Sequence, residues 1–136
     1  MRRILVLLAA SIAVPAFAAD PVKMSTSLTA GQEVPGPGKG SGSADLSFDT
    51  TKGQICYMIM AQGTDTPTMA HIHKGILGVA GAVVVPLKAP ETGMVQACTP
   101  VAPDLMAAIL ATPSDYYVNV HTGEYPKGAM RGQLGK

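Results

Sequence analysis

Residues 54–61 read QICYMIMA, and seven of these eight residues are apolar. Side chains of a β-strand point alternately to its two faces. The two faces here consist of Ile55, Tyr57, Ile59 and Ala61 on one side and Cys56, Met58 and Met60 on the other. Since both faces are apolar, we predict a central strand of a sheet, in which Met58 and Met60 act as flexible packing residues.

Seven further segments have strand-like patterns on either side of this stretch. They begin about eight to twelve residues apart in much of the chain and are separated by turns rich in Gly and Pro. These segments are 22–30, 43–48, 69–73, 82–87, 93–98, 116–121 and 129–134. The pattern predicts an all-β fold, an antiparallel Greek-key-like β-sandwich of about seven or eight strands. Pro86 predicts that its strand lies at an edge or ends there.

One short helix is expected between Pro103 and Pro113. Pro suits the first turn of a helix, and Leu105, Ala108 and Ile109 fall on one apolar stripe. The glycine-rich stretch 31–42 cannot be a regular element, and we interpret it as a loop within the fold.

The first 18 residues have the pattern of a secretory signal peptide. Arg2 and Arg3 precede a short apolar run that ends in Ala16-Phe17-Ala18. We expect cleavage near Ala18, a periplasmic or secreted location, and a single domain over residues 19–136. No later segment is long enough to span a membrane.

Charge and composition argue against a nucleic-acid-binding protein. Without the expected signal peptide, the chain has eight Lys and Arg against nine Asp and Glu. These charges are scattered singly, and the chain has no Trp and two Phe, whereas nucleic-acid binding favours clustered basic residues with interleaved aromatics.

Cys56 and Cys98 are the two cysteines of the chain. An even number of cysteines in an exported protein favours a disulfide, and neither Cys has a second metal ligand at close spacing. We therefore predict the bridge Cys56–Cys98. Closing a loop of this length would contribute about 4 kcal/mol to stability in the loop-entropy model.

The three histidines of the chain are candidate metal ligands. His71 and His73 point to the same side of a strand, with Met69 in phase. His121 lies opposite the apolar face of the 116–121 strand. Three imidazoles that converge near the surface, with a thioether nearby, would suit copper or zinc.

A structural role for these histidines is the alternative. Their rings would then hydrogen-bond loop carbonyls or polar side chains such as Asn119, Thr122 and Glu124 and close the end of the sheet. The default interpretation of Glu33, Glu124 and Arg131, which stand beside glycine-rich turns, is likewise a structural ion pair or turn-closing hydrogen bond. No nucleophile motif or paired carboxylates suggest catalysis.

Five motifs resemble those of the CHRD (chordin-type) domain family, in its single-domain exported bacterial form. They are L-x-x-G-Q-E-V-P at 28–35, A-H-I-H-x-G at 70–75, G-x-V-V-V-x-L at 81–87, Y-V-N-V-H-T at 117–122 and R-G-Q-L at 131–134. The resemblance implies a β-rich domain in which His71, His73, His121 and Thr122 are family features, but it implies no activity. Met130 stands where the family usually has Ile, and it is a further candidate sulfur ligand.

The His-x-His strand and the sandwich also look similar to copper-zinc superoxide dismutase. Three histidines are too few for its paired metal site, which leaves at most one metal ion. We expect an exported, non-enzymatic binding module with an unknown protein partner. The alternative is a mononuclear copper or zinc protein that uses His71, His73 and His121, with Met69 or Met130.

Overall fold

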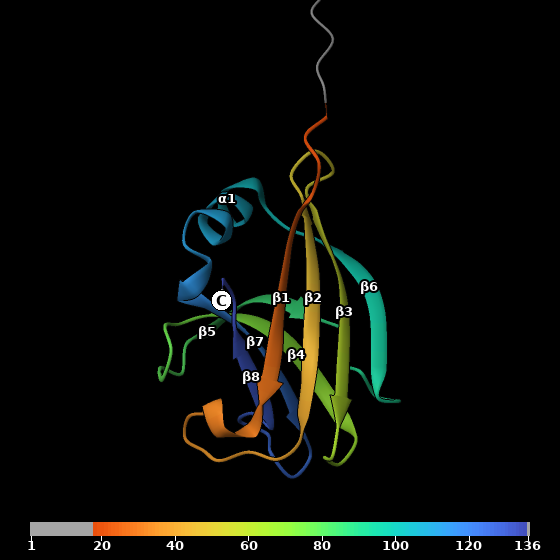
Figure 1. The fold of residues 1–136 in the computed structure, drawn as a ribbon, viewed down its shortest axis with the longest axis vertical. Coiled ribbons are helices and arrows are strands. Elements are labelled where there is room, and N and C mark those ends of the chain that lie inside the picture. Colours follow the sequence, from red (N-terminus) through yellow and green to blue (C-terminus); the bar gives the residue numbers. More distant parts are fainter. Residues whose placement is uncertain (1–17, 136) are drawn as a thin grey trace, which may run out of the picture.

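The computed structural model describes residues 18–135, which form eight antiparallel strands and one α-helix (Figure 1). The strands make one sheet in the order β5-β4-β7-β8-β1-β2-β3-β6. Their bounds are β1 Val22–Thr29, β2 Ser41–Asp49, β3 Gln54–Gln62, β4 Pro67–Lys74, β5 Ala82–Leu87, β6 Met94–Pro100, β7 Tyr116–Thr122 and β8 Met130–Gln133. The predicted all-β, antiparallel class and the short helix are confirmed.

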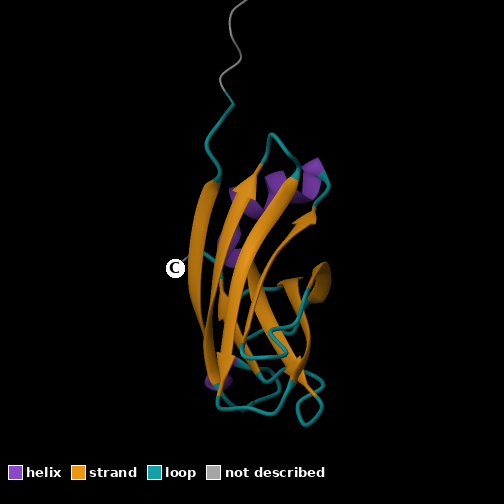
Figure 2. Ribbon diagram, turned by 90° about the vertical axis from the view of Figure 1, so that its right-hand side faces the viewer, coloured by secondary structure: helices purple, strands orange, loops and turns teal. Residues whose placement is uncertain are grey.

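The sheet folds over into two layers, as a sandwich requires. One layer contains β5, β4, β7 and β8, and the other contains β1, β2, β3 and β6. A single residue pair, Thr29 with Arg131, links β1 to β8 and so joins the layers. Figure 2 shows the long strands on one side and the shorter strands and loops on the other. β5 is an edge strand, as Pro86 predicted.

The hydrophobic core lies between the two layers. Period-two alternation places Ile55 and Ile59 of β3, Ile72 of β4, and Val118 and Val120 of β7 inside, where each is fully buried. Helix α1, Pro103–Ala111, covers one end of this core.

Two expectations about packing were wrong in part. β3 lies inside the sheet, but the face that carries Met58 and Met60 points away from the core, and Met60 is 49% exposed. In α1, Met106 and Ile109 are the buried residues, whereas Ala108 is exposed. An apolar pattern on both faces of β3 does not show whether both faces are covered. Here one face is covered and the other is apolar but open to solvent.

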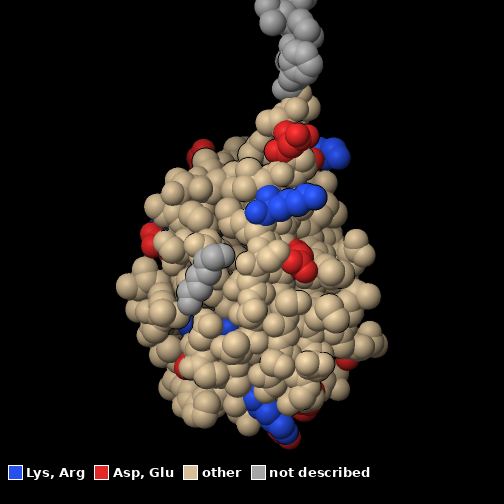
Figure 3. Space-filling view, viewed as in Figure 1, with Lys and Arg blue, Asp and Glu red and all other residues tan. Residues whose placement is uncertain are grey.

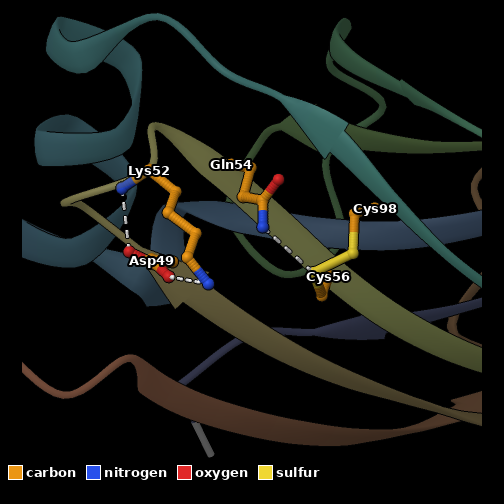
Figure 4. Close-up of a disulfide and its surroundings, with 5 residues drawn as sticks. All are labelled: Asp49, Lys52, Gln54, Cys56 and Cys98. Atoms are coloured by element: carbon orange, nitrogen blue, oxygen red, sulfur yellow. Dashed lines mark hydrogen bonds and ion pairs between the residues drawn. A yellow bond between two sulfur atoms is a disulfide. The ribbon is translucent and has the colours of Figure 1, made fainter.

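The disulfide between Cys56 and Cys98 is formed, as predicted. It joins directly opposed positions of β3 and β6 on the outward face of the sheet (Figure 4). The Gln54 amide donates to Cys56 Sγ at 3.6 Å, and Lys52 pairs with Asp49 in the adjacent β2–β3 turn.

The predicted signal peptide lies, apart from Ala18, outside the described residues. Within residues 18–135, α1 is the one α-helix, and it is too short to cross a bilayer.

Candidate metal centre

Strands β4 and β7 bring the three histidines together. The strands are adjacent and antiparallel, and their register sets Met69 opposite His121 and His71 opposite Asn119. Because alternate residues share a face, His71, His73 and His121 point to the same side of the sheet. The predicted cluster is therefore present in the structure.

The cluster lies on a covered face and not at the surface. Every residue of β7 is buried, because loops cover the face opposite the core. His73 and His121 are buried, and His71 is half-buried. The cluster was expected on or near the surface; it lies just beneath it, with His71 alone half-exposed. His71 is the most exposed of the three.

The ring nitrogens are close enough to share one ion after small movements. His71 Nδ1 lies 3.0 Å from His121 Nε2, and one ligand atom from each of the three rings lies within 4.8 Å of the others. Two imidazole nitrogens on one tetrahedral zinc ion would be about 3.3 Å apart, given bonds of about 2.0 Å. A shift of about 1.5 Å by one side chain would bring all three nitrogens to the spacing that one ion requires.

Two loop carbonyls define which nitrogen of each buried ring is a free base. His73 Nδ1 lies 2.9 Å from the Gly81 carbonyl, and His121 Nδ1 lies 3.0 Å from the Pro126 carbonyl. A carbonyl only accepts, so both Nδ1 atoms carry the proton and both Nε2 atoms keep a lone pair. His71 Nδ1 then donates to His121 Nε2.

The second ring nitrogen of His73, Nε2, makes no hydrogen bond to the rest of the described fold. It is buried and lacks a hydrogen-bond partner among residues 18–135. Buried polar atoms are nearly always paired, so an unpaired nitrogen on a ring whose centroid lies 5.4 Å from that of His71 and 5.9 Å from that of His121 requires an explanation. The rings thus bind loop carbonyls, as the structural alternative predicted. For His73, this hydrogen bond explains Nδ1 but not Nε2.

Burial keeps all three imidazoles neutral at pH 7. It is the main reason that the pKa of His71 falls to about 4, with smaller contributions from His121 and His73. Burial also lowers the pKa of His73 and of His121, against the bonds to Gly81 and Pro126, and the positive Arg131 lowers both further. Neutral imidazole is the form that binds metals.

Tyr117 and Gly81 hold His73 in place. The Tyr117 ring stacks on the His73 ring at a centroid distance of 4.8 Å and an interplanar angle of 7°. The Tyr117 hydroxyl accepts from the Gly81 N–H at 3.0 Å, and the Gly81 carbonyl binds His73. A side chain at position 81 would collide with the Lys74 carbonyl, so glycine is required there.

A buried ion pair lies behind this stack. The Arg131 guanidinium sits over the Tyr117 ring at 4.2 Å and binds the Glu33 carboxylate at 2.9 Å. Asn119 also donates to Glu33. Burial raises the pKa of Glu33, whereas Arg131 and Asn119 act in the opposite direction. The interpretation of Glu33 and Arg131 as a structural ion pair is confirmed.

The two candidate methionine ligands lie in different places. Met69 is opposite His121 on β4 and is 46% exposed, so its position is compatible with the cluster. Met130 is fully buried in the core and pairs with Val120, on the face of β7 opposite His121. The structure therefore does not bring Met130 to the histidines.

Sequence reasoning overlooked the supporting residues of this cluster. It assigned no role to Tyr117 or Gly81. The period-two spacing of Tyr117, Asn119 and His121 was a usable signal. No signal in the sequence indicated which loop would cover that face.

The chain matches the CHRD domain family over residues 24–134, and it belongs to this family. The comparison with curated proteins found no match, and neither did the comparison with solved structures. Family membership supports a binding module in general terms. The cluster and its supports draw on all five motifs, through Glu33, His71 and His73, Gly81, the segment 117–122 and Arg131.

Proposed function

We propose that the chain is an exported binding module that holds one copper or zinc ion with His71, His73 and His121. The observation that carries the proposal is the buried, unpaired Nε2 of His73, a ring that belongs to a cluster whose ligand atoms lie within 4.8 Å of one another. A metal ion would use this lone pair together with those of His121 and His71.

The protonation states favour such a site. Three neutral imidazoles release no proton when they bind a metal at pH 7, so protons compete little for the nitrogens. His71 donates through Nδ1 to His121 Nε2, so ligation by Nδ1 requires its proton to move to Nε2. The positive Arg131 repels a cation at these rings, and Glu33, which pairs with Arg131 at 2.9 Å, weakens that repulsion.

Copper is favoured over zinc. Nitrogen sites bind Cu²⁺ more strongly than Zn²⁺ in the Irving–Williams order, and a thioether is a soft ligand that suits copper. Three protein ligands leave a fourth position open. Met69, which is opposite His121 and partly exposed, is the candidate for that position.

The export part of the proposal rests on the leader-like first 18 residues and on the disulfide. Disulfides persist in oxidising compartments such as the periplasm or the extracellular space. Both features fit a protein that meets metal ions outside the cytoplasm.

Calorimetric titration of the protein with Cu²⁺ and with Zn²⁺ tests this function. We expect one equivalent to bind at micromolar concentration and His71→Ala to abolish that binding. Gln96→Ala, an exposed change on the outward face of β6, is the matched control and should bind as the wild type does. Absence of binding at micromolar metal, or full binding by His71→Ala, would refute the proposal.

A further inference from the structure

The outward face of the β1-β2-β3-β6 layer carries three solvent-accessible methionines, on strands that lie far along the sheet from β4 and β7. Met58 and Met60 project from β3, and Met94 projects from β6. Met60 and Met94 are 49% and 51% exposed, and Met58 is half-buried. None of the three belongs to the core cluster or to the histidine site.

The rest of this face is polar. Apart from the disulfide and Pro100 at a strand end, its other described positions carry Ser, Thr, Gln, Asp or Lys. Figure 3 shows that most of the surface over β1, β2 and β3 is uncharged. If the face required only apolar area, β-branched residues would suit strands better. Each of these three apolar positions instead carries a thioether.

The register brings the three methionines within reach of one another. Met60 and Met94 are directly opposite on adjacent antiparallel strands, which sets their Cβ atoms about 5 Å apart. Met58 is two residues from Met60 on the same face and lies diagonal to Met94, at a Cβ spacing of about 7–8 Å. Methionine is unbranched and flexible, so the three sulfurs can converge above the sheet.

We propose that Met58, Met60 and Met94 form a second metal site, which binds Cu⁺ through three thioether sulfurs. Soft thioether ligands select Cu⁺ over Zn²⁺ and other harder ions. The site is open to solvent, and the carboxylate of Asp45, which is directly opposite Met58 on β2, places a negative charge beside it. The site is independent of the histidine cluster.

Anaerobic titration with Cu⁺ against a chromogenic chelator tests this site in a variant without the histidine cluster. In His71→Ala/His121→Ala, we expect one equivalent of Cu⁺ to bind. Adding Met58→Leu, Met60→Leu and Met94→Leu should abolish that binding, because Leu keeps the volume but lacks sulfur. Met24→Leu, at a half-buried methionine of β1 that packs against the core, is the matched control in the same background and should leave Cu⁺ binding unchanged.

A second measurement needs no substitution. Titration of the wild-type protein with Ag⁺, a redox-stable probe for Cu⁺, should shift the methyl NMR signals of Met58, Met60 and Met94 together and leave those of the core residues Met106 and Met130 in place. Cu⁺ binding that survives the three Leu changes, or Ag⁺ shifts that omit these methyls, would overturn the proposal. Failure of Cu²⁺ and Zn²⁺ binding would refute the histidine site alone.

Discussion

Glu33 and Arg131 form a buried ion pair, with Oε2 of Glu33 3.0 Å from Nε and 2.9 Å from Nη2 of Arg131. The pair ties the loop after β1 to β8 and places the guanidinium over Tyr117. Gly128 makes room for it, because a side chain there would collide with the Glu33 carboxylate. The histidine cluster thus rests on a polar layer that the first and last motifs of the chain build together.

Removal of the Glu33 carboxylate should destabilise the fold strongly. In Glu33→Ala the Arg131 charge stays buried without a partner, which costs about 3–5 kcal/mol. Glu124→Ala, which breaks the exposed pair with Lys39, is the control and should cost less than about 1 kcal/mol. Urea unfolding measures both values, and equal losses would show that the buried pair is not a structural support.

Tyr117→Phe should weaken metal binding without removing a ligand. The ring can still stack on His73, but the Gly81 N–H loses its acceptor and Gly81 holds His73 less firmly. Loss of such an outer contact lowers metal affinity about 10–100-fold. Competition with a chelator of known affinity measures the change. An unchanged affinity would mean that the position of Gly81 does not control the site.

The metal-free protein should lose stability as the pH falls through the histidine range. The pKa of His71 is about 4 in the fold, below the ordinary value of 6.5, so the unfolded chain takes up the proton first. His71 therefore makes the free energy of unfolding fall between about pH 6.5 and pH 4. The contribution is reduced by solvent, because this ring is half-buried.

The comparison with His71→Gln isolates this effect. Glu33, whose pKa is raised, acts in the opposite direction, but it is present in both proteins and cancels in the difference. Urea unfolding with a chelator present should show the wild type losing stability relative to the variant as the pH falls. A difference that does not change with pH would contradict the lowered pKa.

The cross-strand disulfide should stabilise the fold independently of the metal. Cys56 and Cys98 are 42 residues apart, and closing that loop is worth about 4 kcal/mol in the chain-entropy model. Cys56→Ala/Cys98→Ala should lower the free energy of unfolding by about that amount and leave metal stoichiometry unchanged. Loss of the metal in this variant would show that the two features are coupled.

Alternation alone allowed the sequence to predict the strands and the faces of their residues. His71 and His73 necessarily share a face, and the apolar Val118 and Val120 predicted the opposite orientation for His121. The pairing of β4 with β7 could not be deduced, because a strand pattern does not name its neighbour. Met130 was misjudged for the same reason. The pattern of its short strand alone could not show that the Met130 side chain points into the core.

The loops account for most of the remaining differences. Residues 31–42 and 75–81 carry no periodic pattern, so nothing in the sequence indicated that they bring Glu33 and Gly81 over the outer face of β7. That cover is what makes His73 and His121 buried and leaves a lone pair of His73 without a partner. The surface location predicted from alternation assumed an open face.

Zinc titration followed through the side-chain ¹⁵N NMR signals of the histidines tests whether the three rings share one metal ion. We expect Nε2 of His73, Nε2 of His121 and one ring nitrogen of His71 to shift together and to saturate at one equivalent, while Nδ1 of His73 and of His121 stay protonated. Shifts confined to one ring, or no shift at one equivalent, would contradict a shared three-histidine site.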